Sequence, residues 1–384
     1  MSNLQPLNEV IPDLKPFLHT AWDKSAFKKL TTIQLYTTRL ILEGKDIIAE
    51  SPTGSGKTLA YLLPLLQQIK PDQKNTQVVI LASSHELVMQ IHQHVQDWSK
   101  QSEIGSATLI GGANVKRQIE KLKKKPQLVI GTPGRINELI SQKKLKMHQV
   151  KTIVLDEADQ LLVSEHLAII EGIVKSTMKD RQVLVFSATL PDPVQKTAAR
   201  IMNSPEVIQV GNEEDDRPNV TYLYLVCEAR DKIDWLRKLI RNQEMKALVF
   251  VKDITTLSVL AEKLDYMGIR AGVLHSDANK QERAKAMKAF RDGESELLLA
   301  SDVAARGLDI PNLSHVIHMD LPNEKTQFVH RSGRTGRLGA ESGTVIAIVT
   351  EIEERQLQKF SRQLGLTVVK GTIRKGQFIN NEER

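Results

Sequence analysis

The sequence lacks several features that would place it in particular protein classes. Cys227 is the only cysteine among 384 residues, which excludes a disulfide framework and a cysteine-ligated zinc site. No apolar run approaches the about 20 residues that a membrane-spanning helix needs. Residues 1–14 contain neither a basic segment nor an apolar one, so we expect no secretory signal. These absences predict a cytoplasmic protein with no membrane partner.

The composition is that of a globular protein with more than one domain. Hydrophobic residues make up 41% and charged residues 26% of the chain, which are ordinary values for such proteins. A chain of 384 residues exceeds one ordinary core and predicts two or three domains. The net charge of +7 is compatible with a polyanionic partner, although charge alone does not identify one.

Short apolar runs alternate with helical stretches along most of the chain. The runs lie at 46–49, 77–82, 107–110, 127–132, 152–157, 182–188 and 207–210, and then at 221–227, 247–251, 271–275, 296–301, 315–320 and 343–349. Such runs are typical of parallel strands with helices on both faces of the sheet. Residues 211–218, GNEEDDRP, are polar and turn-rich. We therefore predict two doubly wound, parallel-sheet α/β domains, 1–210 and 219–384, joined by a linker at 211–218.

The stretch SPTGSGKT, residues 51–58, lies between an expected strand and an expected helix. Main-chain N–H groups of such a loop point at phosphate oxygens, and glycines let the backbone approach them. Lys57 is expected to reach the outer phosphates and Thr58 to hold Mg²⁺. The residues expected to bind nucleotide here are Ser51, Thr53, Gly54, Ser55, Gly56, Lys57 and Thr58. A glycine-rich turn without a ligand is the alternative, since Ser51 stands where the strict pattern has glycine.

Three carboxylates follow directly after the apolar run in TIVLDEADQLL, residues 152–162. Asp156 ends the expected strand and is predicted to bind Mg²⁺ directly or through water. Glu157 is predicted to polarise the attacking water, and Asp159 to organise its neighbours. A solvated helix N-terminus would explain the acids, but it would not explain the buried strand before them.

At these positions the sequence resembles the DEAD-box family of ATP-dependent RNA helicases, named for residues 156–159. The ordered motifs extend over nearly the whole chain. The resemblance implies two tandem RecA-like domains, ATP and Mg²⁺ as cofactors, and RNA as partner. We further expect a monomer, and ribosome assembly is an expectation at the level of the family.

The resemblance also implies roles for residues of the first domain. In AFKKLTTIQ, residues 26–34, Phe27 would stack on the adenine ring and Gln34 would bond its edge. In SAT, Ser187 and Thr189 would join Asp159 in coupling the nucleotide state to RNA remodelling. The residues that would face RNA are His85, Gly111, Gly112, Thr132, Pro133, Gly134 and Arg135.

Further motifs lie in the second domain. SDVAARGLDIP, residues 301–311, carries Asp309 at the ribose-binding position, and HRSGRTGR, residues 330–337, carries the arginine-finger residues Arg334 and Arg337. The interspersed glycines of the latter suggest backbone crowding. The remaining implied roles are RNA contact for Arg283, Ser301 and Arg306, and coupling for His330.

Several positions depart from the family pattern. Leu30 and Thr32 replace two prolines and Ala26 a glycine of the adenine motif. His85 replaces the arginine of the PTREL element, and Ser83 and Ser84 precede it. Two more departures lie in the second domain, at Ser276 and Lys280. The phosphate and carboxylate residues are unchanged, so ATPase chemistry is expected, whereas the strength of RNA binding is in doubt.

The resemblance implies that the catalytic set is divided between the two domains. Hydrolysis would wait until the domains close around ATP, and RNA bound across both would favour closure. Recognition would rest on phosphates and 2′-hydroxyls rather than base sequence. Two alternatives remain: a nucleotide-gated RNA clamp with little unwinding, and a DNA-directed helicase. The basic segment 115–126 could extend RNA contact, but a solvated helix face is the more frequent meaning of such a pattern.

Overall fold

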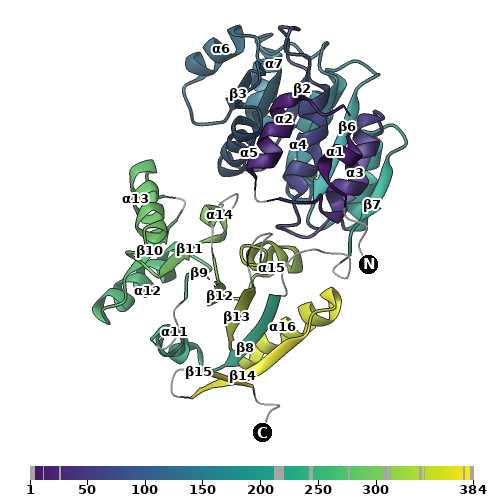
Figure 1. Ribbon diagram of the computed structural model, residues 1–384. Coiled ribbons are helices and arrows are strands. Elements are labelled where there is room, and N and C mark those ends of the chain that lie inside the picture. The colour runs from purple at the N-terminus through teal and green to yellow at the C-terminus, as the bar shows by residue number, and fades with distance from the viewer. Residues whose placement is uncertain are drawn as a thin grey trace. The chain divides into compact units, whose positions relative to one another are not determined.

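The computed structural model describes residues 5–11, 13–25, 27–211, 220–241, 245–275, 277–305, 310, 313–336, 340, 342–374 and 377–380. The chain divides into two compact units, residues 1–216 and residues 217–384, which we describe separately (Figure 1). This division falls inside the segment expected as linker. Residues 212–219 lie outside the described part, so the bounds of the linker stay a prediction.

A seven-stranded sheet forms the centre of the first unit. Its strands are β1 (Ile47–Glu50), β2 (Val78–Leu81), β3 (Ser106–Leu109), β4 (Leu128–Gly131), β5 (Thr152–Asp156), β6 (Gln182–Ser187) and β7 (Glu206–Gln209). Their order is β3-β4-β2-β5-β6-β1-β7, and every pairing is parallel. Because parallel strands end at the same edge of a sheet, the loops that follow these strands meet along one edge.

Helices cover both faces of this sheet (Figure 1). They are α1 (Leu7–Val10), α2 (Pro16–Lys24), α3 (Thr32–Leu42), α4 (Lys57–Gln68), α5 (His85–Trp98), α6 (Val115–Lys123), α7 (Pro133–Ser141), α8 (Ala158–Leu161), α9 (Ser164–Lys175) and α10 (Asp192–Arg200). In β2, Val78 and Ile80 pack into the buried cluster that contains residues of α1–α5, whereas Val79 and Leu81 pack into the cluster that contains residues of α7–α10. Both faces are therefore buried, which explains the continuous apolar runs.

The second unit contains an eight-stranded sheet of order β10-β11-β9-β12-β13-β8-β14-β15. Its strands are β8 (Val220–Val226), β9 (Ala247–Phe250), β10 (Ala271–Leu274), β11 (Leu297–Ala300), β12 (His315–His318), β13 (Gly343–Val349), β14 (Val368–Arg374) and β15 (Gln377–Asn380). Its helices are the 3₁₀ turn η2 (Ala229–Asp231), α11 (Lys232–Ile240), α12 (Ile254–Tyr266), α13 (Lys280–Arg291), α14 (Asp302–Ala305), α15 (Lys325–Ser332) and α16 (Glu351–Leu364). The β14–β15 pairing is antiparallel, and the other described pairings are parallel.

The doubly wound parallel α/β class predicted for both halves is confirmed, and each predicted strand range coincides with an observed strand to within a few residues. The strands β14 and β15 were not predicted. The reason is that β14 pairs with the rest of the sheet only through Val368–Lys370 and then turns into a hairpin with β15. Because only three residues of β14 pair with β8, and because β14 contains Lys370 and Gly371, its sequence shows no continuous apolar run.

None of the helices in the described part of the chain is long and apolar enough to cross a membrane.

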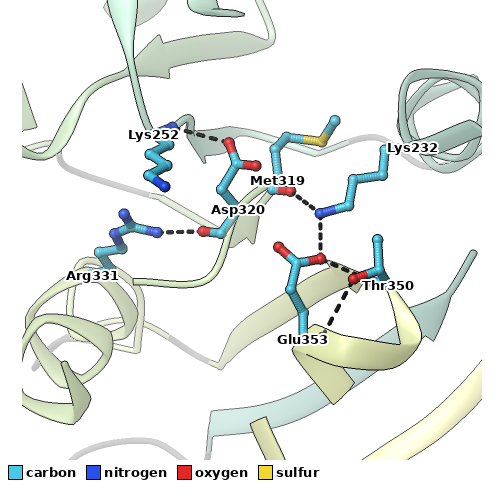
Figure 2. A network of polar contacts seen from close by, with 7 residues as sticks. All are labelled: Lys232, Lys252, Met319, Asp320, Arg331, Thr350 and Glu353. Carbon is cyan, nitrogen blue, oxygen red and sulfur yellow. Dashed lines mark hydrogen bonds and ion pairs between the residues drawn. The ribbon is translucent and has the colours of Figure 1, made fainter. Parts of the chain in front are cut away.

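Two helices of the second unit are anchored at the end of β12 by the buried Lys232 (Figure 2). Its ammonium donates to the Met319 carbonyl at 2.6 Å and to Glu353 Oε2 at 2.7 Å. Burial acts to raise the pKa of Glu353, but the hydrogen bonds from Lys232 and Thr350 outweigh it and the pKa is lowered. A buried ammonium needs such partners. Lys232 therefore ties the start of α11 and the start of α16 to the same strand end.

Arg331 of α15 makes a second anchor in this unit. Its guanidinium is almost fully buried and pairs with both carboxylate oxygens of Asp302, at 2.5 and 2.6 Å. It also donates to the Asp320 carbonyl at 2.7 Å (Figure 2) and lies 5.0 Å from the centre of the Phe250 ring. The two-pronged pair is the strong geometry for arginine and carboxylate, so it joins α14 firmly to α15.

His318, the last residue of β12, is fully buried beside this arginine. Its ring stacks on Phe328, with centroids 4.9 Å apart, and on Phe250, with centroids 6.0 Å apart. Burial, and then the charge of Arg331, hold the pKa of His318 well below its usual range. The imidazole is therefore neutral in the folded unit.

Replacing His318 by phenylalanine should make the second unit less sensitive to acid. In the unfolded chain a histidine gains a proton as the pH falls below about 6.5, whereas buried His318 stays neutral. The unfolded state then binds more protons, so the free energy of unfolding falls by up to about 1.4 kcal/mol per pH unit below about pH 6.5 and is unaffected above it. Phenylalanine keeps the stacking and removes this loss.

The measurement is the free energy of urea unfolding at several pH values between about 7.5 and about 5.5. The fluorescence of Trp235 monitors the unfolding. Trp22 and Trp98 would be replaced by phenylalanine in both proteins, so that the signal comes from the second unit alone. His315, whose pKa is also lowered by burial, remains in both. Equal slopes of stability against pH in the two proteins would contradict the prediction.

Candidate active site

The loop of residues 51–56 connects β1 to α4 at the carboxyl edge of the first sheet. Gly54 and Gly56 have φ values of +84° and +92°, a conformation that residues with a side chain rarely adopt. The Ser51 and Ser55 hydroxyls bond at 2.6 Å, and the Ser51 N–H donates to the Ser187 carbonyl at 3.1 Å. The loop is therefore held in a fixed curve and tied to the neighbouring strand β6.

Lys57, the first residue of α4, folds over this loop. Its ammonium donates to the carbonyls of Ser51 and Pro52 at 2.6 and 2.7 Å. The positive charge thus lies against a glycine-bearing loop at a helix N-terminus, where main-chain N–H groups and the helix dipole favour an anion. This arrangement fits the phosphate groups that the sequence predicts.

Asp156 ends β5 and is almost fully buried. Its Oδ2 accepts from the Tyr61 hydroxyl at 2.8 Å and its Oδ1 from the Glu157 N–H at 2.9 Å. Burial raises the pKa of Asp156 to about 6; the charge of Glu157 adds to this, while Tyr61 and Lys57 oppose it. A buried carboxylate with these few partners is a favourable ligand for a hard cation.

Glu157 lies next to it in an unusual conformation. Its φ of +53° and ψ of +53° place a residue with a long side chain in the left-handed region, which costs on the order of 1–3 kcal/mol. Its carboxylate accepts a hydrogen bond at Oε2 from the Ser83 hydroxyl at 2.6 Å. The side chain is thus fixed at its main-chain end and at its carboxylate end.

Asp159 joins the acidic tetrapeptide to the SAT motif. Its Oδ1 accepts from the Ser187 hydroxyl at 2.8 Å and its Oδ2 from the Thr189 hydroxyl at 3.1 Å. Asp159 and Ser187 are both buried. The structure therefore brings together the three residues that the sequence predicts as a coupling set, although their role stays a prediction.

Gln34 is buried, and both ends of its amide are bonded. Its Oε1 accepts from the Thr31 N–H at 3.0 Å, and its Nε2 donates to the Gly56 carbonyl at 3.2 Å. The Thr31 hydroxyl donates to the Ser55 carbonyl at 2.9 Å. Gln34 thus caps α3 and supports the phosphate loop, and each amide atom keeps capacity for one further bond to a base. Phe27 lies 6.4 Å from Trp22 between ring centres.

The residues predicted to face RNA in the first unit follow β2, β3 and β4, which are adjacent in the sheet. His85, the first residue of α5, is exposed, and its Nε2 lies 3.5 Å from the place that a Cβ on Gly111 would occupy. Gly112 has φ +66° and is exposed. Thr132 precedes α7, which begins with Pro133 and Gly134.

Arg135, in contrast, is buried. Its guanidinium donates to the Ala113 carbonyl at 3.3 Å, and its Nε lies 2.8 Å from Glu138 Oε2. It supports the loop that contains the two glycines, and direct RNA contact by Arg135 stays a prediction. On α6, by comparison, Lys116 and Arg117 are exposed, which is compatible with a solvated face and with RNA contact alike.

The described part of the chain contains some, but not all, of the residues predicted for the site in the second unit. Arg306, Asp309 and Arg337 lie outside the described residues. Ser301 is buried at the end of β11, and Arg283 of α13 donates to the Ala304 carbonyl at 3.3 Å. Their contact with RNA stays a prediction.

The described part of HRSGRTGR surrounds the end of α15. His330 is half-buried in that helix, and Arg334 just after it is buried. A Cβ on Gly336, whose φ is +61°, would lie 2.3 Å from Val220 Cγ2. Such a contact is impossible without a shift, so the crowding predicted for these glycines is confirmed at this position.

Comparisons with known proteins identify the family. Residues 31–197 match the DEAD/DEAH box helicase family, and residues 231–339 match the helicase conserved C-terminal domain. The chain belongs to the DEAD-box family of ATP-dependent RNA helicases. This confirms the family that the ordered motifs indicated.

Two bacterial DEAD-box relatives match almost from end to end. The probable ATP-dependent RNA helicase YfmL of Bacillus subtilis is 54% identical, over 94% of this chain and 98% of its own. The helicase CshC of Bacillus cereus is 49% identical, over 98% of this chain and 96% of its own.

Solved structures of DEAD-box proteins have the same fold. Dbp5 of S. cerevisiae bound to RNA and ADP BeF3 matches with a TM-score of 0.84 and 30% identity, over 95% of this chain and 96% of its own. Mss116p bound to single-stranded RNA and AMP-PNP also gives 0.84, with 28% identity, over 97% of this chain and 81% of its own. The predicted pair of RecA-like domains is therefore confirmed.

Tyr61 and Ser83 contact the carboxylates of the DEAD tetrapeptide, but sequence reasoning did not assign them to the site. Tyr61 lies inside an apolar helix, where a tyrosine is indistinguishable from a core residue. The position of Ser83 could have been inferred, because β2 and β5 were both predicted and Leu81 pairs with Leu155. Two residues further on, Ser83 lies beside Glu157.

The substitution His85→Arg should strengthen RNA binding by this DEAD-box protein. Arginine is permanently charged and offers a phosphate several hydrogen-bond donors in a planar fork, which a histidine side chain does not. At the exposed position beside Gly111, the added charge should steepen the salt dependence of RNA affinity by up to about one unit. The measurement is the dissociation constant for single-stranded RNA over a range of salt concentrations.

Gln93→Arg is the matched control, because it adds the same charge to an exposed position of the same helix. It should change the RNA affinity and its salt slope less than His85→Arg does. If His85→Arg and the unchanged protein gave the same affinity and slope, the predicted phosphate contact would be wrong.

Proposed function

We propose that this protein hydrolyses ATP at the carboxyl edge of the first sheet and uses the cycle to separate short RNA duplexes. The observation that carries the proposal is the meeting of the Lys57 loop with Asp156 and Glu157 at that edge. A basic phosphate cradle beside two carboxylates has the parts that phosphoryl transfer to water requires.

The nucleotide would lie with its phosphates in the loop of residues 51–58 and its adenine against Phe27 and Gln34. Gln34 already bonds the Gly56 carbonyl, so base recognition and the phosphate loop share one side chain. A base that fits Gln34 would therefore also keep the loop in its curve. The ribose contact by Asp309 remains part of the proposal.

Mg²⁺ fits the donor set at this edge. The Asp156 carboxylate and the Thr58 hydroxyl are hard oxygen ligands, and Mg²⁺ is commonly bound through one or two carboxylates together with substrate phosphates. When bound, Mg²⁺ would neutralise part of the phosphate charge. Tyr61 would orient Asp156 by its hydrogen bond and leave the remaining carboxylate lone pairs for the ion or its water.

Glu157 would orient the attacking water, and Arg334 and Arg337 would stabilise charge on the transferred group. Such arginines contribute about 10³–10⁵ in rate, so hydrolysis should require both units. Asp159, Ser187, Thr189 and His330 would transmit the nucleotide state to RNA. The hydrogen bonds from Ser187 and Thr189 to Asp159 in the first unit support that role for these three residues.

RNA would be bound through its backbone by residues after β2, β3 and β4 and by Arg283, Ser301 and Arg306. The RNA in the related Dbp5 and Mss116p structures supports this. We further propose that the protein is a cytoplasmic monomer acting on ribosomal particles during assembly. The comparisons offer no support for a clamp that does not unwind, nor for a DNA-directed helicase. Strand displacement on matched RNA and DNA duplexes tests both alternatives.

Glu157→Gln should leave ATP binding nearly unchanged and slow hydrolysis by about 100-fold or more, because the amide cannot accept a proton from water. Lys57→Ala should instead weaken ATP binding itself. Single-turnover hydrolysis and nucleotide titration separate the two effects. Near-normal turnover by the Glu157 variant would remove this residue from the proposed role.

ATP should be preferred to GTP in RNA-stimulated turnover. Adenine presents an amino group to the Gln34 carbonyl oxygen, whereas guanine presents O6, and two facing acceptors leave buried polar groups unpaired. The measurement compares kcat/KM for the two nucleotides at saturating RNA. Equal values would show that Gln34 does not read the base.

A further inference from the structure

Ser83 is bonded to the carboxylate at the centre of the proposed reaction. It follows β2, and its hydroxyl donates to Glu157 Oε2 at 2.6 Å. The contact follows from the parallel register, since Leu81 of β2 pairs with Leu155 of β5. The PTREL element of the family has proline at this position, and proline has no side-chain donor. The hydroxyl is therefore a property of this chain rather than of the motif.

We propose that Ser83 is a positioning residue for ATP hydrolysis, which holds one oxygen of Glu157 so that the other oxygen faces the attacking water. This inference rests on the proposed role of Glu157 as the residue that orients that water. Ser83 itself would touch neither the nucleotide nor the water.

The geometry favours orientation over simple packing. An O–H···O⁻ bond of 2.6 Å is in the short range of charge-assisted hydrogen bonds. A carboxylate has two oxygens and about four acceptor positions, so one bond at Oε2 leaves Oε1 able to accept from water. The left-handed backbone of Glu157 fixes the start of the side chain, and the Ser83 hydroxyl fixes its far end. A catalytic group that is displaced by about 1 Å can lose about 100-fold in rate.

The neighbouring serine shows what a structural role at this place would look like. Ser84 caps α5, and its side-chain oxygen accepts from the Leu87 N–H at 3.1 Å. The helix start is therefore secured by Ser84. The described bond of the Ser83 side chain leads instead to the acidic tetrapeptide.

Ser83→Thr and Ser83→Val form a matched pair, because the two side chains have the same shape and only threonine keeps the hydroxyl. Ser83→Val and Ser83→Ala should lower the kcat of RNA-stimulated ATP hydrolysis by about 5- to 30-fold and change the KM for ATP by less than about twofold. Ser83→Thr should retain activity to within about threefold. Ser176→Ala is the control, since it removes a hydroxyl that donates to the Ile173 carbonyl and should leave both constants unchanged.

The decisive measurement repeats Ser83→Ala in the Glu157→Gln background under single-turnover conditions. With the carboxylate gone, loss of the hydroxyl should cause no further fall in the hydrolysis rate. An equal fall in both backgrounds, an unchanged kcat, or a kcat that rises in Ser83→Ala would each overturn the inference. If Glu157→Gln alone hydrolysed ATP normally, the proposed function of Glu157 would fail first, and the result would be distinguishable from failure of the Ser83 step.

Discussion

The buried carboxylate of Asp156 is the constraint on which the edge of the first sheet depends. Burial of a charged group is costly unless hydrogen bonds and opposite charge compensate. Here Tyr61 from α4 and the Glu157 N–H compensate by hydrogen bonds, and the charge of Lys57 adds to them. All three lie on elements that begin or end at the same edge, because the strands are parallel. The phosphate loop and the acidic tetrapeptide are therefore parts of one electrostatic arrangement.

In the second unit the buried charges are positive, and they too are compensated by hydrogen bonds and opposite charge. Arg331 and Lys232 are buried cations, and each is held by a carboxylate from another helix and by a main-chain carbonyl near the end of β12. Removing either partner of such a pair leaves an uncompensated charge. The end of β12 is thus the place where α11, α14, α15 and α16 are fixed relative to the second sheet.

The sequence predicted most of the fold, for a physical reason. Strands of a parallel sheet covered on both faces must be apolar at nearly every position, as Val78–Leu81 is, so they stand out without knowledge of the partners. The loop containing Gly54 and Gly56 was predictable because its conformation restricts the residue type. The hairpin β14–β15 was not predictable, because only Val368–Lys370 is paired with the parallel part of the sheet.

The site was predicted as a set of motifs, but the bonds between them were not. Tyr61 and Ser83 reach their partners through the fold, 95 and 74 residues along the chain, and no local pattern marks them. Gln34 was expected to read a base, and the structure adds that it also caps α3 and supports the loop. Arg135, expected to face RNA, is buried and supports the loop with Gly111 and Gly112. In each case a contact with residues distant in the sequence gives the side chain a structural role that the spacing of motifs along the chain does not reveal.

Ser187 connects the loop of residues 51–56 to the acidic tetrapeptide. Its carbonyl accepts from the Ser51 N–H at the start of the phosphate loop, and its hydroxyl bonds the Asp159 carboxylate at 2.8 Å. The loop that begins at Ser51 and the acidic tetrapeptide are therefore both hydrogen-bonded to the same residue. Because Ser187 is bonded to both, a shift of the end of β6 would move the loop and the tetrapeptide together and would change the distance between them little. A longer or shorter side chain at position 187 would instead move Asp159 relative to the loop, because only the bond to Asp159 is made by the side chain.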